Sequence, residues 1–497
     1  MKKSKQLLSV LLVMLMIIFT ACTQQPAETD APGETETPEN ETKAEDVIVD
    51  MVVVGGGMAG LSTSIEAARL GANVILLEKL SFVGGSSALC EGYIWSSDAK
   101  FNEKTGQGFD AQTMTDYLND NHLGQGNSEL VRNIVNVSGK VLDTYLEEGL
   151  RLNTDEFTYG GVYNENLLMP FTAPQDGAGM IIDMKKIAEQ KGVDIRVSSP
   201  ATDILTGDNG EVIGVTVKDE DGTYNIYADT VVLTTGGFAN NDELMKEYLP
   251  TFADNRILQG TVGATGDGHK MALKLGGSII GESMLGTYAL DEMPTYEMPI
   301  GGAIYSARFV VNKEGLRFCK EFGNDADGDD YFFAVSKQTG NQAFALFDSN
   351  SAMADVLDES STEGLAAKAD TLEELAKAAG INYEALAKEV EAYTSDSING
   401  IDDSKWGLPN EEMAPLIEGP FYLVEMNPWS CMGVMAGVKV NKNCQVLGEN
   451  DEPIENLYGA GELIMGNIVY DRYPTCGTAL AAGMYGGVIA ANHALGK

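Results

Sequence analysis

Residues 50–61 read Asp-Met-Val-Val-Val-Gly-Gly-Gly-Met-Ala-Gly-Leu, and a helical pattern and a second apolar run at 74–78 follow them. The three valines predict a buried strand. Gly55 permits a tight turn after it, Gly57 lets backbone approach a pyrophosphate, and Gly60 lets the following helix pack on the strand. The N-terminus of that helix presents free N–H groups to phosphate. We therefore predict a strand–turn–helix unit that holds the ADP part of a dinucleotide.

The acid that closes the second apolar run supports this interpretation. Glu78 lies 18 residues after Gly60, where the second strand of such a unit ends and a carboxylate can accept hydrogen bonds from ribose hydroxyls. A glycine-rich turn alone is weak evidence, because ordinary tight strand–helix turns use the same residues. The agreement of both strands, the helix and the acid favours dinucleotide binding.

The composition limits the class of protein. The chain has 497 residues, of which 44% are hydrophobic and 22% charged, and a formal net charge of −41. These values are typical of a globular protein of roughly two or three domains. The negative charge argues against nucleic-acid binding, because an acidic surface repels phosphate. The three histidines are widely separated and the cysteines form no Cys-x-x-Cys pair, so we expect no metal site, iron–sulfur cluster or disulfide framework.

The first 22 residues have the pattern of a secretion signal. Three lysines precede an apolar run at 7–19, and small residues lead to Cys22. This resembles a bacterial lipobox, which makes Cys22 the predicted lipidation site; a simple signal peptide with a chance cysteine is the alternative. Residues 23–46, rich in Pro, Thr and Glu, predict a disordered acidic linker. We expect an extracytoplasmic protein held at the cell membrane by a lipid anchor only.

The middle of the chain continues a nucleotide-domain pattern. Residues 194–197 predict a strand, and 212–217 and 224–228 predict a hairpin around an Asp-Gly turn at 221–222. Residues 230–233 predict a further buried strand that ends in glycines. A three-strand insertion followed by a returning strand is typical of flavoprotein nucleotide domains.

The pattern then changes to short strands, turns and two amphipathic helical stretches at 372–379 and 383–394. We predict an inserted α+β cap domain at 284–431. The nucleotide-binding domain would consist of the two parts on either side of it, residues 47–283 and 432–497.

Several motifs, in order along the chain, are similar to those of one family. They are 55–60 with Glu78, 84–87, 234–238, 264–268, 310–312 with 315–318, and 459–462. From about residue 50 to its end the chain resembles the flavin-dependent superfamily of fumarate reductases, urocanate reductases and 3-ketosteroid dehydrogenases. The resemblance implies an α/β fold, with a Rossmann-like FAD-binding domain and an inserted α+β cap domain, and FAD as the cofactor.

The resemblance also implies where FAD binds. Gly85 and Ser86 would lie by the isoalloxazine ring, and Glu462 on the ribityl side. The helix after Gly477 would direct N–H groups at flavin O2, where its partial positive charge stabilises reduced flavin. Asp267 would be close to the flavin, or it only forms a turn. The implied cofactor-binding residues are Gly55, Gly57, Ala59, Gly60, Glu78, Gly85, Ser86, Gly236, Asp267, Glu462, Thr478, Ala479 and Leu480.

The chain departs from fumarate-type members where substrate should bind. Those enzymes clamp a dicarboxylate with Arg and His, and a cap Arg that follows an Arg-Phe-x-x-Glu segment delivers the proton. That segment is 317–321 here, but the position of the acid Arg falls near Asp325, and no Arg occurs between Arg317 and Arg472. Residues 430–433 read Ser-Cys-Met-Gly where a His is expected. An acidic loop repels a dianion, so we predict that fumarate is not the substrate.

The C-terminal segment is closer to another branch. Residues 473–477 read Tyr-Pro-Thr-Cys-Gly, similar to the Tyr-Pro-x-x-Gly element of 3-ketosteroid dehydrogenases. In that branch the Tyr hydroxyl and the Gly N–H polarise the substrate ketone, which implies catalytic roles for Tyr473 and Gly477. Arg472 either clamps a substrate carboxylate or pairs with the acidic loop or Asp471.

In the same branch a second Tyr, from the cap, acts as acid or base. Tyr331 is the best analogue because it follows the Arg-Phe-x-x-Glu segment. Tyr288, Tyr296 and Tyr305 are its rivals, and each is also explained as a packing residue.

The expected reaction is hydride transfer between flavin N5 and the β-carbon of an α,β-unsaturated carbonyl compound. A 3-oxo-4-ene steroid is the most specific substrate that the resemblance suggests. The alternatives are an enoate reductase that uses Arg472, and a non-catalytic binding lipoprotein that retains FAD. Because no haem motif is present, electrons would come from an external donor, either a membrane carrier or a redox protein.

Overall fold

The computed structural model describes residues 45–101, 110–153, 171–172, 176–254, 256–290, 293–295, 298–321 and 328–497. The predicted lipidation site Cys22 and nearly all of the predicted linker lie outside the described residues. Within the described residues, no helix has both the length and the apolar character needed to cross a lipid bilayer.

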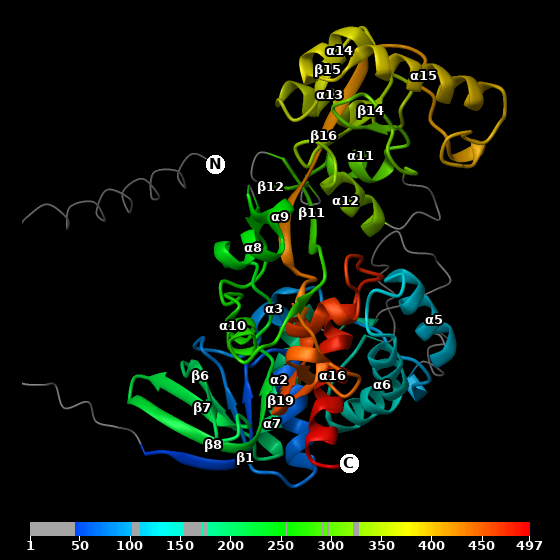
Figure 1. The fold of residues 1–497 in the computed structure, drawn as a ribbon. Helices are drawn as coiled ribbons and strands as arrows, with labels where there is room; N and C mark the ends of the chain where they lie inside the picture. The colour runs from blue at the N-terminus through cyan, green and yellow to red at the C-terminus, as the bar shows by residue number, and fades with distance from the viewer. Residues whose placement is uncertain are drawn as a thin grey trace, which may run out of the picture. The chain divides into compact units, whose positions relative to one another are not determined.

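The glycine-rich turn joins a central strand to a helix, as predicted. Strand β1 (Val47–Val54) lies between β2 (Val74–Leu77) and β8 (Gly222–Leu233) and pairs in parallel with both. The sheet has the order β18-β19-β8-β1-β2-β5 (Figure 1). Parallel strands are covered on both faces, which explains why their sequences are nearly continuous apolar runs. The other members of this order are β5 (Asp194–Arg196), β18 (Gln445–Leu447) and β19 (Pro453–Gly459).

One strand differs from its prediction. The predicted hairpin arm at 224–228 and the predicted strand at 230–233 are a single twelve-residue strand, β8. Its first part pairs antiparallel with β7 (Val212–Asp219), which in turn pairs with β6 (Ala201–Thr206). Its last part is buried between β1 and β19. Asp229, between the two parts, is exposed because buried and exposed side chains alternate along the strand. Its polarity therefore does not mark the end of the strand.

Helix α16 (Thr478–Ala494) packs closely against α2 (Met58–Arg69), and Figure 1 shows the two side by side. A Cβ on Gly487 would lie 2.7 Å from the carbonyl oxygen of Ala59, so only glycine permits this approach. The other helices are α3 (Gly85–Leu89), α5 (Ala111–Asn121), α6 (Ser128–Glu148), α7 (Asp176–Gln190), α8 (Asp242–Tyr248), α9 (Pro250–Ala253), α10 (Asp267–Lys274), α11 (Gly301–Ser306), α12 (Gly328–Ser336), α13 (Ala354–Thr362), α14 (Leu372–Ala379) and α15 (Tyr383–Ile398).

A second sheet forms the core of the cap. Strand β16 (Phe421–Val434) pairs with β11 (Met284–Leu290) at one end and with β14 (Ala343–Phe347) and β15 (Ala367–Ala369) at the other. It runs without a break through the predicted boundary between residues 431 and 432. Figure 1 shows it extending from the cap helices toward the nucleotide-binding sheet. The helices predicted at 372–379 and 383–394 are confirmed as α14 and α15. The remaining short strands are β3 (Tyr93–Ile94), β4 (Phe171–Thr172), β9 (Ile257–Leu258), β10 (Ile279–Ile280), β12 (Met293–Pro294), β13 (Val310–Val311) and β17 (Gly437–Val438).

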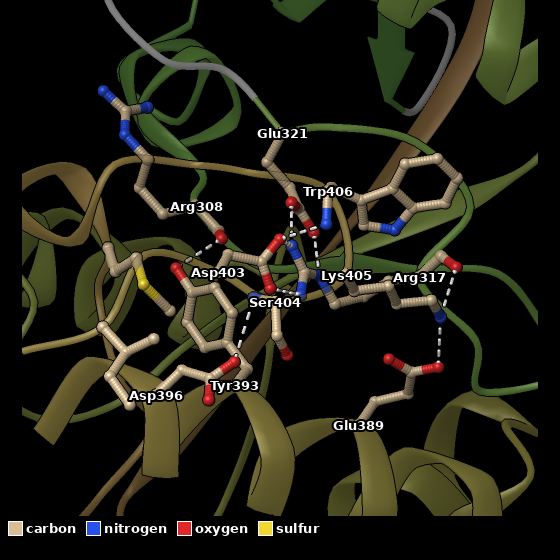
Figure 2. A network of polar contacts seen from close by, with 12 residues as sticks. Arg308, Arg317, Glu321, Glu389, Tyr393, Asp396, Asp403, Ser404, Lys405 and Trp406 are labelled. Atoms are coloured by element: carbon tan, nitrogen blue, oxygen red, sulfur yellow. Dashed lines mark hydrogen bonds and ion pairs between the residues drawn. The ribbon is translucent and has the colours of Figure 1, made fainter. Parts of the chain in front are cut away.

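A buried ion cluster joins the cap elements (Figure 2). The guanidinium group of Arg317 donates to both carboxylate oxygens of Asp403, at 2.7 and 3.0 Å, and to Glu321. It also lies over the ring of Tyr393, 4.6 Å from the centroid. Burial disfavours the charged form of Arg317, but the two carboxylates outweigh it and raise the pKa of the guanidinium group. The cluster therefore ties the turn after β13 to α15 and to the loop that follows α15.

Candidate active site

A cavity of about 590 Å³ lies at the carboxyl ends of β1, β2 and β8. Parallel α/β sheets bind ligands at this edge. The cavity starts at the glycine-rich turn and extends to the residues that precede and open α16. Its lining also includes segments of β11 and β16, so the nucleotide-binding sheet and the base of the cap share one space.

The glycine-rich turn has the geometry that a pyrophosphate requires. Gly55 has a φ of +111°, and a Cβ on Gly60 would lie 1.8 Å from the carbonyl oxygen of Gly55. Gly57 precedes α2 without a side-chain cap. Its N–H and that of Ala59 have no acceptor among the described residues. These open N–H groups at a helix N-terminus form an anion site. Gly60 itself packs against the strand and does not line the cavity.

Glu78 lies at the same turn. Its buried carboxylate accepts hydrogen bonds from the N–H groups of Gly56 and Leu80, each at 2.8 Å. These two bonds hold the side chain in place at the cavity wall. A carboxylate offers about four acceptor positions, so capacity remains for ribose hydroxyls.

Asp267 is the first residue of α10, and it lines the cavity. The ammonium group of Lys79 lies 2.6 Å from its carboxylate and also donates to Thr265. Lys79 is the one cationic side chain in the described lining of the cavity, and its charge is neutralised there.

Glu462 lines the cavity beside Gly236. Burial raises the pKa of its carboxyl group, although hydrogen bonds from the N–H groups of Val434 and Gly237 oppose that shift. The neighbouring Thr235 hydroxyl is buried and has no hydrogen-bond partner among the described residues. An orphaned hydroxyl in the cavity wall is consistent with a polar ligand that supplies the missing bond. Gly85 and Ser86, at the start of α3, also line the cavity.

The start of α16 is arranged differently from its prediction. Gly477 precedes the helix with a φ of +88°. The N–H of Ala479 donates to the hydroxyl oxygen of Tyr473 at 2.8 Å, and the N–H of Thr478 donates to the carbonyl of Thr475 at 3.3 Å.

These two bonds bear on the expectation for α16, which stays a prediction. Of the three N–H groups predicted to face flavin, those of Thr478 and Ala479 are engaged by the protein. The N–H groups of Gly477 and Leu480 have no acceptor among the described residues. The sequence did not indicate that the hydroxyl of Tyr473, six residues before Ala479, accepts a hydrogen bond from this helix end.

Residues 50–480 match a family model described as an FAD binding domain. The chain belongs to this FAD-binding family. It is 30% identical over 460 residues to a probable fumarate reductase of Shewanella frigidimarina, covering 90% of this chain and 75% of that protein. It is 28% identical over 452 residues to urocanate reductase of Eggerthella lenta, covering 86% and 72%. The 3-ketosteroid-Δ4-(5α)-dehydrogenase of Rhodococcus jostii in complex with 4-androstene-3,17-dione has the same fold, with a TM-score of 0.73 at 22% identity over 90% of this chain and 97% of that one.

These matches confirm the predicted superfamily, the α/β fold with an FAD-binding domain, and FAD as the cofactor. The chain is an FAD-dependent oxidoreductase that acts on carbon–carbon bonds. The open N–H groups at Gly57 and Ala59, the carboxylate of Glu78 and the orphaned Thr235 hydroxyl fit this cofactor. Bound FAD supplies hydride transfer.

The predicted catalytic residues fall into two groups. Tyr473 and Gly477 both line the FAD cavity. Arg472 does not belong to its described lining, and its Nε lies 3.8 Å from the carboxylate of Asp471, the partner that the second interpretation proposed. The backbone of Tyr331 belongs to α12, but its side chain lies outside the described residues, as does Tyr296.

The other two Tyr candidates pack inside the cap. Tyr288 is 1% exposed, and its ring centroid lies 6.1 Å from that of Tyr305 and 5.7 Å from that of Phe332. Neither Tyr288 nor Tyr305 lines the FAD cavity in its described part. The cavity wall instead includes Tyr93 and Thr287, which sequence reasoning did not select. Tyr93 follows the small-residue segment at 84–87, and this proximity is a signal that could have identified it.

Proposed function

We propose that this flavoprotein reduces the carbon–carbon double bond of a neutral α,β-unsaturated carbonyl compound, with a 3-oxo-4-ene steroid as the most specific candidate. The charge of the cavity supports the proposal most strongly. Its described lining contains no Arg or His, and its Lys79 is paired with Asp267 at 2.6 Å. A carboxylate substrate would therefore lose its hydration without gaining a counter-ion, which is unfavourable in a buried site.

A neutral carbonyl oxygen has suitable donors at the other end of the cavity. The hydroxyl oxygen of Tyr473 accepts from the N–H of Ala479, which fixes the position of the hydroxyl at the cavity wall. A donor that also accepts a hydrogen bond is a stronger donor, because the two bonds polarise each other. Tyr473 and the open N–H of Gly477 would hold the carbonyl oxygen and stabilise the negative charge that develops on it as hydride reaches the β-carbon.

The proton at the α-carbon needs a separate group. We assign it to a Tyr of the cap, with Tyr331 of α12 as first candidate, because a phenol hydroxyl can act as a general acid. We further propose that reduction is the physiological direction and that an external carrier or redox protein supplies electrons. The signal-like N-terminus with Cys22 supports an extracytoplasmic protein anchored to the membrane by lipid.

The names of the relatives favour a second candidate. Fumarate and urocanate, which those relatives' names specify, are unsaturated carboxylates. An enoate reductase that uses Arg472 is therefore the alternative. It requires the guanidinium group to leave Asp471, 3.8 Å away, and to reach the cavity.

A turnover assay with reduced viologen separates these candidates. We expect a 3-oxo-4-ene steroid to oxidise the viologen, and fumarate and urocanate to leave it reduced. Turnover of either carboxylate at a higher kcat/KM than the steroid would contradict the neutral-substrate proposal. The Arg472→Met variant then tests the alternative, since only an enoate reductase loses its activity. Failure of every unsaturated compound to reoxidise the flavin would support the third candidate, a non-catalytic binding lipoprotein that retains FAD.

A further inference from the structure

Tyr93 lines the FAD cavity, and the proposed reaction has not used it. It forms the short strand β3 together with Ile94. Ile94 is completely buried, whereas Tyr93 is half-buried. Because successive side chains of a strand point to opposite faces, Ile94 faces the core and the side chain of Tyr93 faces the cavity.

Strand β3 lies directly against the turn that opens α16. A Cβ on Gly477 would be 3.1 Å from backbone atoms of both Tyr93 and Ile94, so these two chain segments are in contact. The next residue, Trp95, donates from its indole N–H to the hydroxyl of Thr478 at 3.2 Å, which fastens the end of β3 to the first turn of α16. Tyr93 therefore enters the cavity beside Gly477, at the end where the substrate carbonyl is expected.

The hydroxyl group of Tyr93 is not committed to the protein. No hydrogen bond joins it to another described residue, and burial, followed by the neighbouring Glu91, Cys476 and Asp176, raises its pKa. The phenol therefore keeps its proton at neutral pH and can donate it in a hydrogen bond to a ligand. Cys476 immediately precedes Gly477, so this hydroxyl and the turn share one end of the cavity.

We propose that Tyr93 is a catalytic residue whose hydroxyl donates to the substrate carbonyl oxygen, as a third donor beside Tyr473 and Gly477. The inference rests on the proposed function, in which that oxygen belongs to an unsaturated ketone. As hydride reaches the β-carbon, the electrons of the double bond move to this oxygen, and a donor aimed at it stabilises the enolate. Tyr93 keeps its proton in this step, and the proton of the α-carbon still comes from the cap.

The Tyr93→Phe variant, which removes only the hydroxyl, tests the proposal in the FAD-loaded protein with reduced viologen and androst-4-en-3-one. We expect kcat to fall about 10²-fold while KM changes little, because the negative charge on the oxygen develops only in the transition state. Tyr227→Phe is the matched control. Tyr227 is also half-buried and lies in the same domain, but it does not belong to the described lining of the cavity. An unchanged kcat in Tyr93→Phe would overturn the proposal.

Flavin content and thermal unfolding provide the second measurement. Because the Tyr93 hydroxyl has no partner among the described residues, its removal should leave both the flavin content and the melting temperature at the wild-type values. A fall in either value would show that the hydroxyl serves the cofactor site or the fold, and it would overturn the catalytic role.

Binding of oestradiol distinguishes failure of this inference from failure of the proposed function. Its phenol oxygen takes the place of the ketone oxygen, and its binding is measured by the absorbance change of oxidised flavin. The Kd should be about tenfold higher in Tyr93→Phe, the usual effect of one lost buried hydrogen bond, and unchanged in Tyr227→Phe.

If the wild type reduces no enone, the proposed function is wrong. The same rise in the Kd for oestradiol would then still support Tyr93 as a donor to a steroid oxygen. Equal Kd values in the wild type and Tyr93→Phe, or no binding to the wild type, would overturn the inference.

Discussion

The hydroxyl oxygen of Tyr473 accepts a hydrogen bond from the backbone N–H of Ala479 at 2.8 Å. The bond satisfies one of the N–H groups that every helix leaves open at its N-terminus. It also orients the Tyr473 hydroxyl beside Gly477, on the cavity wall. One side chain thus caps α16 and lines the cavity, which links the stability of the helix end to the proposed chemistry.

Replacing Tyr473 by Phe should lower kcat/KM for an unsaturated ketone by about 10²–10³-fold, the range seen when one donor to a developing oxyanion is removed. Stopped-flow reoxidation of the reduced flavin measures this directly. Tyr470→Phe is the matched control, because its hydroxyl bonds Glu282 at the surface. A Tyr473→Phe enzyme with wild-type turnover would refute the oxyanion role.

Gly60→Ala should prevent FAD binding. The new Cβ would lie 1.8 Å from the carbonyl oxygen of Gly55, so the turn and α2 must separate. The protein should purify without the flavin absorbance and with a lower melting temperature. Gly486→Ala is the control within α16, since its Cβ would have 3.8 Å to the nearest side-chain atom. This second variant should retain FAD; equal flavin content in both would show that the close approach is not required.

Arg317→Met should destabilise the cap by about 3–5 kcal/mol, because it leaves two carboxylates buried without their partner. Arg317 and Glu321 are each 1% exposed, and so is Asp403. Urea unfolding followed by tryptophan fluorescence measures the loss, since Trp406 lies beside the cluster (Figure 2). Arg308→Met, at a half-buried position where the guanidinium group bonds only backbone carbonyls, should change stability little. Equal effects of both substitutions would contradict the assigned role of the cluster.

His269 should make the folded protein sensitive to acid. Burial against Phe238 lowers the pKa of its imidazole from 6.5 to about 3, and neither ring nitrogen has a partner among the described residues. Below pH 6.5 the unfolded chain therefore binds a proton that the folded chain does not. The stability that this group contributes is complete above that pH, and it falls by up to about 1.4 kcal/mol per pH unit toward the folded pKa.

His269→Phe tests this dependence. The variant should match the wild type near neutral pH and become the more stable protein as the pH falls toward about 4.5. Urea titrations at several pH values measure the difference. Parallel pH profiles for the two proteins would mean that the imidazole is accessible to water and titrates normally.

Much of the cofactor site could be predicted because its rules are local. The turn at Gly55 requires a positive φ, and the acid that ends the next strand follows at a fixed distance in the sequence. Such features depend on a few neighbouring residues, so short windows of sequence contain them. The helices α14 and α15 were predicted for the same reason, since their apolar spacing is periodic.

The substrate end could not be predicted in the same way. The exposed Asp229 within β8 made one continuous strand look like two. The pattern changes there because the first part of β8 pairs with β7, whereas the last part is buried beside β1. The pairing of Thr287 with Ser430 depends on a register shift that no short segment specifies. The Lys79–Asp267 ion pair likewise joins positions far apart in the chain.

The sequence by itself determined the FAD-binding fold and predicted the place of the ADP group, because glycine sterics and hydrophobic periodicity act over a few residues. The tertiary structure alone decided which polar groups meet in the cavity. It neutralises Lys79 and commits the Ala479 N–H to Tyr473. These contacts arise from strand register and helix packing, which bring distant residues together only when the whole chain has folded.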